Sequence, residues 1–522
     1  MRTGEKAALQ PDSSADRLNG VVLSQLASLL PDYIASRRWF RAKTRTIQSV
    51  EIEDALPTSH ASSCLLVTRL KYTEGEPDIY LVDAIVAEGI FSDIHPALSE
   101  RPFRDALLTA ITCNRSFQGT AGELSAARTI ALPQDCGRPD FTLDSSVGKA
   151  EQSNTSILYG DRFILKLFRK LEPGTNPDIE IGTFLTERGF EHTPPVLGKI
   201  EYTRGSDGAT YAVAILQQFV RNQGDAWKYT LDSLSGFFRR ALATNEYAPK
   251  LASYHPADGA ANSRPESRKL IGEYVDSARL LGQRTAEMHA ALADPQGGDD
   301  FAPEAFTLAD GRKLHEEMLG QADIAFELLR RKQPALTGTA TENARMLLRG
   351  EHRVTELFSP LRDQPITAAR IRVHGDYHLG QVLYTGTDFM IIDFEGEPAR
   401  ALSERRGKTL AMRDVAGMIR SFQYAAYAAL FGQVEGIPQD PEMSDRIESW
   451  AAFWAASIGA EYLNGYFSNA EGLPFLPRDS RERRVLLDAY LLQKALYEVA
   501  YELNNRPDWV RIPLRGILSL IS

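Results

Sequence analysis

The chain has 522 residues, of which 43% are hydrophobic and 25% charged, so it can bury a sizeable core in roughly three domain-sized units. Its 59 Lys and Arg against 69 Asp and Glu give a formal net charge of −10, and no dense basic run interrupts that balance. These values exclude disorder as the main state and argue against nucleic acid or an anionic membrane as the main partner.

No apolar run approaches the ~18 residues of a membrane helix, and the N-terminus lacks the apolar core of a signal peptide. The three cysteines, Cys64, Cys113 and Cys136, are odd in number and form no CxxC pair, so neither a disulfide framework nor a structural zinc site is predicted. We therefore expect a soluble protein in the reducing cytoplasm.

In chain order, a flexible lead-in and a small α+β domain are predicted first. Residues 1–19 are polar and rich in Ser, Asp and Ala, which is typical of a flexible segment. The stretch 20–147 contains a short helix around 23–30 and two alternating segments, 64–70 and 80–86, which suit an antiparallel hairpin. We predict an N-terminal cap domain over 20–147.

A β-rich lobe is predicted over residues 148–223. Residues 155–168 suit two strands joined by a tight Gly-Asp turn, and 211–220 suits a third strand. Between them, 176–189 begins with Asn and Pro and ends in Gly, which predicts a helix packed on these strands.

The remainder, residues 224–522, is predicted to be a helical lobe. Apolar residues recur every three or four positions in 281–292, 415–429 and 485–503, and such stripes are typical of core. One segment, 371–398, breaks the pattern with short strands, a polar loop and an acidic loop. We expect the chemistry to lie in this segment.

Asp376 and Asp393 each end a β-like apolar stretch, and the hairpin between them would bring the two carboxylates close together. One carboxylate suits a general base and the other a metal ligand. Gln381 could add an amide oxygen to a Mg²⁺ site. Phosphoryl transfer needs these parts, because a carboxylate must orient the acceptor hydroxyl and a metal must offset phosphate charge.

Two other interpretations apply to these residues. For a single aspartate, a turn carboxylate that accepts from backbone N–H groups is an equal alternative. An iron site begun by His374 and Asp376 needs a further histidine from later in the chain, and none follows His378. His378 itself suits a hydrogen-bonded loop residue better than a metal ligand.

Lys166 lies in the middle of an apolar strand, where a charge is unwelcome unless it meets an anion. We expect its ammonium group to meet a phosphate and Glu180, on the following helix, to hold it there. The alternative is a strand-edge lysine that reaches water.

Two further stretches complete a predicted nucleotide site. The loop EQSNTS, 151–156, precedes Lys166 and offers hydroxyl, amide and backbone N–H groups to phosphate oxygens, although no GxGxxG or Walker motif is present. The predicted loop contacts are Ser153, Asn154 and Ser156. At the end of the third strand, Gln217, Phe219 and Val220 are expected to present backbone groups to adenine.

In order, EQSNTS, Lys166, Glu180, HGDYHLGQ and DFEGEP resemble the aminoglycoside-phosphotransferase and choline-kinase branch of the protein-kinase-like fold. Longer blocks resemble bacterial maltokinases, including the maltokinase portion fused to trehalose synthase, and the likeness spans nearly everything after about residue 20. These blocks are 37–47, 164–181, 373–383, 391–422 and 494–517.

This resemblance implies an α+β, two-lobed kinase-like fold with an additional N-terminal cap domain, and ATP and Mg²⁺ as cofactors. It implies Asp376 as the base toward the anomeric hydroxyl of maltose, and Gln381 and Asp393 as Mg²⁺ ligands. Lys166 and Glu180 would clamp the nucleotide. The products would be ADP and maltose 1-phosphate, which feeds α-glucan synthesis, and an association with trehalose synthase is possible on the same grounds.

Recognition of a sugar needs an aromatic plate beneath the ring, which Tyr497, Tyr501 and Trp509 could supply; both tyrosines fit the core stripe of their helix equally well. His374 and Asp376 are also expected to contact the acceptor. The basic residues that follow DFEGEP suit a solvated patch and a phosphate clamp equally; they are Arg405, Arg406 and Lys408.

Two alternatives to a maltose kinase stay open. The first is a kinase of the same fold that phosphorylates glucosamine, an aminoglycoside or another small hydroxyl acceptor. The second is a non-catalytic nucleotide-binding partner of a trehalose-forming enzyme, against which the intact catalytic set argues.

Overall fold

The computed structural model describes residues 20–58, 63–86, 93–137, 141–148, 153–243, 246–249, 265–438 and 440–521, and the predicted lead-in 1–19 lies outside them. The chain divides into two compact units, Met1–Arg221 and Asn222–Ser522. Among the helices so described, none is both long and apolar enough to cross a bilayer.

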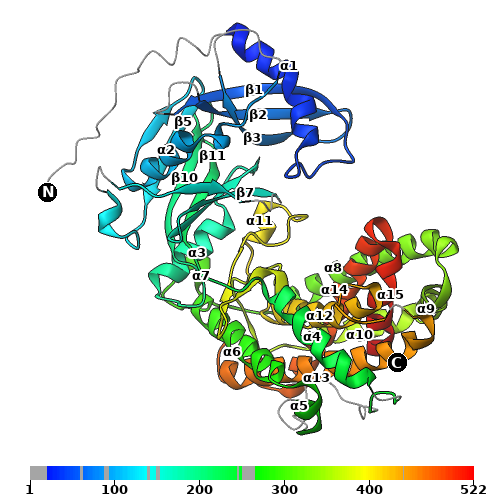
Figure 1. Cartoon of the computed structure of the whole chain (residues 1–522). Coiled ribbons are helices and arrows are strands. Elements are labelled where there is room, and N and C mark those ends of the chain that lie inside the picture. Colours follow the sequence, from blue (N-terminus) through cyan, green and yellow to red (C-terminus); the bar gives the residue numbers. More distant parts are fainter. Residues whose placement is uncertain are drawn as a thin grey trace. The chain divides into compact units, whose positions relative to one another are not determined.

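The first unit begins with a four-stranded antiparallel sheet in the order β1-β2-β3-β9. Its elements are α1 (Gly20–Ser36), β1 (Ile47–Pro57), β2 (Ser63–Tyr72), β3 (Asp78–Ile85) and β9 (Lys170–Leu171). Helix α1 packs against β1 (Figure 1). Side chains alternate along β2, so Leu66 and Leu70 join the apolar cluster under α1. On the opposite face, Leu65 and Val67 join the core of the second sheet.

The second sheet of this unit has seven antiparallel strands in the order β4-β5-β10-β11-β8-β7-β6. The strands are β4 (Ser116–Gln118), β5 (Gly122–Arg128), β6 (Ser145–Val147), β7 (Asn154–Tyr159), β8 (Phe163–Phe168), β10 (Val196–Arg204) and β11 (Thr210–Gln218). The domain boundary predicted between residues 147 and 148 lies within this sheet. Strand β6 precedes the boundary, β7 follows it, and the two strands pair with each other.

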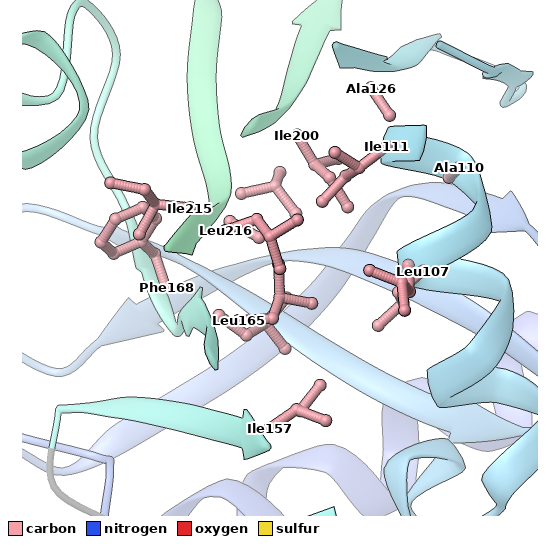
Figure 2. Close-up of a cluster of buried hydrophobic side chains, with 14 of the residues drawn as sticks. Leu107, Ala110, Ile111, Ala126, Ile157, Leu165, Phe168, Ile200, Ile215 and Leu216 are labelled. Carbon is pink, nitrogen blue, oxygen red and sulfur yellow. The ribbon is translucent and has the colours of Figure 1, made fainter. Parts of the chain in front are cut away.

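Two helices and two 3₁₀ turns accompany this sheet: α2 (Arg101–Thr112), α3 (Pro177–Glu187), η2 (Ala97–Ser99) and η3 (Gln134–Gly137). Figure 2 shows Leu107 and Ile111 of α2 facing the strand residues Leu165, Ile200 and Leu216, and all five are at most 1% exposed. Burial of such side chains stabilises each by about 1.5 to 3 kcal/mol relative to exposure, so α2 is held mainly by its apolar face.

Two local predictions in this unit are confirmed. Strands β7 and β8 form a hairpin whose turn residue Gly160 has φ of 57°, a value that glycine adopts without strain. Helix α3 begins at Pro177, and the Asn176 side chain accepts hydrogen bonds from the backbone N–H groups of Asp178 and Ile179. The predicted cap and first helical position therefore coincide with the observed ones.

The second unit is mainly helical; its described residues also form two small antiparallel sheets, β12–β13, whose strands are distant in the chain, and the hairpin β14–β15. Its strands are β12 (Glu304–Ala305), β13 (Ala369–Arg370), β14 (Val382–Tyr384) and β15 (Phe389–Ile391). Its α-helices are α4 (Ala226–Leu242), α5 (Pro265–Ile271), α6 (Tyr274–Leu292), α7 (Gly298–Phe301), α8 (Leu308–Lys332), α9 (Gly338–Arg349), α10 (Glu351–Asp363), α11 (Leu402–Arg405), α12 (Met412–Tyr427), α13 (Ser444–Ala470), α14 (Ser480–Asn505) and α15 (Arg511–Ile521). Its 3₁₀ turns are η5 (Gln333–Ala335), η6 (Leu379–Gln381), η7 (Ala428–Phe431), η8 (Pro441–Met443) and η9 (Pro507–Val510).

Helices α6 and α13 pack closely at two glycines. A Cβ added to Gly282 would lie 2.0 Å from the carbonyl oxygen of Tyr462, and one added to Gly465 would lie 2.0 Å from that of Arg279. Only glycine permits such an approach of two helix backbones. The predicted apolar stripes are buried as expected; Leu281, for example, is 1% exposed.

Candidate active site

The segment predicted to carry the chemistry forms an irregular loop that leads from β13 through η6 to the β14–β15 hairpin. Gly375 has φ of 86°, and a Cβ there would lie 3.3 Å from the Cα of Gly396. The HGD sequence therefore needs its glycine for both backbone conformation and space.

A buried carboxylate on α12 holds this loop in place. Asp414, 1% exposed, accepts hydrogen bonds from the backbone N–H groups of His374 (2.7 Å) and Gly375 (2.9 Å). Its Oδ2 also lies 3.2 Å from His289 Nε2, and His289 Nδ1 lies 2.9 Å from the hydroxyl of Tyr466. Burial acts to raise the pKa of Asp414, but these hydrogen bonds and the nearby histidines outweigh it and lower that pKa.

His374 is predicted to contact the acceptor, but in the structure its side chain is buried beside the loop. Its ring is 1% exposed, and its Nε2 lies 2.9 Å from the carbonyl oxygen of Ile392. Its Nδ1 accepts a hydrogen bond from the backbone N–H of Asp376 at 3.4 Å. Both ring nitrogens thus contact backbone, and the ring joins the loop of Asp376 to the strand end before Asp393.

Asp376 is partly exposed at the end of the loop. Its Oδ1 lies 3.6 Å from Lys494 Nζ of α14, and its Oδ2 lies 4.0 Å from His378 Nε2. His378 Nδ1 accepts from the backbone N–H of Gly380 at 3.0 Å, as expected for a hydrogen-bonded loop histidine. Burial lowers the pKa of His378, which disfavours its protonated form.

Gln381 directly precedes β14, and Asp393 comes two residues after the end of β15. The backbone N–H of Ile392 donates to the carbonyl oxygen of Gln381 at 3.0 Å, which extends the hairpin register to the residue before Asp393. Asp393 has φ of 70°, a left-handed conformation that costs a non-glycine residue about 1 kcal/mol or more. An amide and a carboxylate are the hard oxygen donors that Mg²⁺ prefers, so these residues fit the expected ion.

A pocket of about 300 Å³ opens beside Asp376. This volume lies at the lower end of the roughly 300 to 1,000 Å³ typical of small-molecule sites. Its charged and aromatic lining includes Asp376, Glu397, Arg400, Arg413, Lys494 and Tyr497.

Two of the carboxylates that line this pocket, Asp376 and Glu397, each have a basic partner with a Lys or Arg side chain. Glu397 Oε2 lies 3.1 Å from Arg400 Nε and 3.0 Å from Arg413 Nη2, while Asp376 faces Lys494. Tyr497 is hydrogen-bonded to Glu397, and burial, followed by the charges of Glu397 and Asp376, raises the pKa of Tyr497 to about 12. Tyr497 is therefore a neutral hydrogen-bonding group at the pocket wall.

The three predicted sugar-binding aromatic residues have different surroundings. Tyr497 lines the pocket, and Tyr501, 45% exposed, stacks on it with ring centroids 6.5 Å apart. Trp509 stacks on Phe431 at 4.5 Å, with the guanidinium of Arg506 4.6 Å from its ring centroid, and it does not line the pocket. Tyr497 and Tyr501 thus form one aromatic surface, whereas Trp509 belongs to another stack.

The basic residues after DFEGEP are tied to neighbouring segments. Lys408 Nζ lies 2.8 Å from Glu304 Oε1, and Arg406 Nη2 lies 3.5 Å from Asp300 Oδ1. Arg405 Nη1 donates to the carbonyl oxygen of Glu395 at 3.2 Å. These contacts favour structural ion pairing over the phosphate-clamp interpretation.

In the first unit, Lys166 of β8 forms an ion pair with an acidic residue of α3. Its Nζ lies 3.1 Å from Asp178 Oδ2, and the two side chains are 16% and 1% exposed. Asp178 precedes the predicted partner Glu180 by two positions. Ser156 of β7 lies directly opposite Lys166 in the antiparallel register. Lys166 therefore meets a buried anion, as its position in an apolar strand requires.

The other predicted nucleotide contacts lie at strand ends of the seven-stranded sheet. Ser153 and Asn154 stand at the start of β7, whereas Glu151 and Gln152 of the predicted loop lie outside the described residues. Gln217 pairs with Ile164 near the end of β11. Phe219 and Val220 follow that strand, and the backbone N–H of Phe219 already donates to the carbonyl oxygen of Arg162 at 2.8 Å.

Sequence reasoning missed several pocket and loop residues, among them Asp414, His289, Glu397, Arg413 and Lys494. Glu397, Arg413 and Asp414 lie in the block 391–422. The available signal was Asp414, an acid beside the apolar helical stripe that begins at Val415. His289 offered no such signal, because a histidine within a helical stripe usually packs in the core.

Comparison with solved structures defines the class of fold. A glucosamine kinase in complex with glucosamine, ADP and inorganic phosphate matches with a TM-score of 0.61 at 17% identity, covering 94% of this chain and 99% of that chain. A second crystal form of glucosamine kinase gives a TM-score of 0.63 over the same shares, also at 17% identity. The chain thus has a two-lobed, kinase-like α+β fold, and the predicted fold class is confirmed.

Two curated proteins are similar in sequence. A glucosamine kinase of Mycolicibacterium smegmatis (strain ATCC 700084 / mc(2)155) is 25% identical over 373 residues, which cover 71% of this chain and 78% of that protein. A glucosamine kinase of Streptacidiphilus jiangxiensis is 24% identical over 424 residues, with shares of 78% and 82%. No family model matches the chain. These relatives are glucosamine kinases, so the resemblance to maltokinases stays a prediction.

Proposed function

We propose that this protein is a sugar kinase that transfers the γ-phosphoryl group of ATP to a hydroxyl group of a small sugar. The observation that carries the proposal is the position of Asp376, at the end of a braced loop and in the wall of a pocket of about 300 Å³. The likeness in sequence to glucosamine kinases over most of the chain supports it.

In this reaction Asp376 accepts the proton of the acceptor hydroxyl as that oxygen forms its bond to the γ-phosphorus. The bond from the γ-phosphorus to the oxygen that bridges it to the β-phosphorus breaks, and ADP leaves. Lys494, 3.6 Å from Asp376, orients the carboxylate. Proximity and orientation supply most of the rate, since phosphoryl transfer demands little covalent chemistry from the protein.

For the nucleotide, we assign Lys166 to the phosphates, with Asp178 as its partner and Glu180 as a further acid on the same helix. Gln381 and Asp393 would hold Mg²⁺, which neutralises charge on the transferred phosphoryl group. Ser153, Asn154 and Ser156 would contact phosphate oxygens, and Gln217, Phe219 and Val220 the adenine.

Glucosamine is the first candidate acceptor, because the two curated relatives described above are glucosamine kinases. A neutral sugar such as maltose is the second candidate, and the pocket charges favour it. An ammonium group prefers an acid without a basic partner, yet Asp376 faces Lys494 and Glu397 faces two arginines. Neutral hydroxyl groups could form hydrogen bonds to these paired side chains without breaking an ion pair, so no charge would be left without a partner. Association with a trehalose-forming enzyme stays a prediction.

The test is phosphorus NMR of the products formed from Mg-ATP with glucosamine, maltose, glucose or N-acetylglucosamine. A new phosphate-ester signal with glucosamine, or with maltose, identifies the acceptor and the phosphorylated position. An Asp376→Asn variant in the same panel should form the ester ~10³-fold more slowly or not at all. Absence of an ester with every sugar, at protein concentrations comparable to those of the substrates, would reject the proposed function.

A further inference from the structure

Arg169 is a buried charge in the first unit to which the proposed reaction assigns no role. It follows β8 directly, three residues after Lys166, and is 3% exposed. Its Nη1 lies 2.8 Å from Asp83 Oδ1 of β3, and its Nε donates to the hydroxyl oxygen of Thr155 in β7 at 2.9 Å. One guanidinium group therefore links the four-stranded sheet to a strand of the seven-stranded sheet.

The β3 side of this link is firmly held. Asp83, 1% exposed, also accepts from the backbone N–H of Leu98 at 2.8 Å through its second carboxylate oxygen. Arg169 Nη1 donates to the carbonyl oxygen of Leu81 at 3.3 Å, and the backbone N–H of Leu81 donates back to the carbonyl oxygen of Arg169 at 2.8 Å. A buried ion pair whose partners also bond to fixed backbone groups has a well-defined geometry.

The β7 side of the link lies among the proposed phosphate contacts. Thr155 stands between Asn154 and Ser156 and is 1% exposed. Successive side chains of a strand point to opposite faces. Thr155, paired with Leu167, therefore faces Arg169, while Ser156, paired with Lys166, faces the other way. A shift of β7 at Thr155 would move Ser153, Asn154 and Ser156 relative to Lys166.

We propose that Asp83 and Arg169 are positioning residues for nucleotide binding, which act through Thr155 to fix the start of β7. The inference rests on the proposed function and gives the four-stranded sheet a role as a brace for the phosphate-contacting segment. An ion pair of purely structural importance would destabilise the unit when broken but would leave the affinity for ATP unchanged in the folded protein.

The experiment compares four variants of the full chain. Thr155→Val removes only the hydroxyl acceptor on β7, and Thr155→Ser restores it. Asp83→Asn breaks the ion pair on β3. Asp54→Asn is the matched control, because Asp54 is also 1% exposed and accepts hydrogen bonds from Ala55, Thr120 and Tyr202, all of them outside β7.

Three measurements decide the proposal: the Kd for Mg-ATP by calorimetry, the KM values for ATP and sugar, and hydrogen exchange of the β7 amides. Thr155→Val and Asp83→Asn should raise the Kd and KM for ATP about three- to tenfold, with the KM for sugar unchanged and faster exchange in β7. Thr155→Ser should restore wild-type values. Asp54→Asn should lower the Tm without changing the KM for ATP.

Unchanged ATP affinity in folded Thr155→Val and Asp83→Asn proteins would overturn the proposal, as would an equal loss of ATP affinity in Asp54→Asn. If the wild-type chain binds no ATP, the proposed function itself fails. In that case the rate of hydrogen exchange still tests whether Arg169 fixes β7 through Thr155. An unchanged exchange rate of the β7 amides in Thr155→Val would contradict this positioning role as well.

Discussion

The surroundings of Lys166 and of Asp376 show two ways of holding a reactive group. Lys166 lies on the regular strand β8, and its partner Asp178 lies on α3, 12 residues further along the chain. Asp376 lies on an irregular loop whose backbone is held by Asp414, 40 residues from His374; Asp414 in turn contacts His289, 125 residues before it. A regular element positions a side chain through its own hydrogen bonds, whereas a loop needs distant buried groups.

The largest effect is expected at Asp376. Asp376→Asn keeps the size of the side chain but removes the base, so kcat for sugar phosphorylation should fall ~10³-fold or more. ADP release measures the rate, and calorimetry with Mg-ATP should show unchanged nucleotide affinity. Near-normal turnover in this variant would remove Asp376 from its assigned role.

The support of the loop is expected to matter almost as much. Asp414→Asn converts one acceptor oxygen into a donor facing backbone N–H groups, so the loop should shift and kcat should fall about 10²-fold. Asp388→Asn, which alters an ion pair with Arg284 in the same unit, is the control. Equal kcat in the Asp414 variant and the control would show that the loop keeps its geometry without Asp414.

The stability contributed by Asp414 should also depend on pH. Because its pKa in the folded protein lies below the ordinary value of 3.8, its contribution is present above that value and is lost as the pH falls through the folded pKa. The difference in free energy of unfolding between wild type and Asp414→Asn should therefore shrink in acid. Denaturant titrations at pH 7 and near pH 3 measure it, and a constant difference would contradict the lowered pKa.

A smaller effect distinguishes the two acids of α3. Asp178→Asn should raise the KM for ATP about tenfold, because Lys166 loses the carboxylate 3.1 Å from its ammonium group. Of the two variants, Asp178→Asn should give the larger rise in KM compared with Glu180→Gln, because the Asp178 carboxylate is 1% exposed and its loss leaves a buried charge unbalanced. The opposite order of effects would assign the tether to Glu180, as the resemblance to kinases implies.

An effect of the same size, on the KM for sugar instead of the KM for ATP, is expected at the aromatic wall of the pocket. Tyr497→Ala should raise the KM for sugar about tenfold with little change in kcat, since a stacking and hydrogen-bonding surface is lost. Trp509→Ala should instead lower the Tm, because Trp509 stacks on Phe431 outside the pocket. A matching rise in the KM for sugar in Trp509→Ala would restore its predicted contact with the acceptor.

Prediction from sequence succeeded where neighbouring residues decide the structure. The β7–β8 hairpin, the Asn176 cap of α3 and the buried stripes of the long helices follow from periodicity and turn chemistry. It was incomplete where partners come from elsewhere in the chain. Trp509 was grouped with Tyr497 and Tyr501 from sequence proximity, yet its ring stacks on Phe431, which lies 78 positions earlier.

The sequence by itself determined the kinds of element and the short segments that hold the acidic and basic groups, because propensity, periodicity and motif spacing are local properties. The kinase-like fold class was implied by the resemblance of its motifs to a known family. Only the tertiary structure decided that Asp178 pairs with Lys166, that Asp414 carries the HGD loop and that Arg169 joins two sheets. A buried charge needs an oppositely charged or hydrogen-bonding partner nearby in space. That partner can lie anywhere in the sequence, so the local sequence pattern does not predict it.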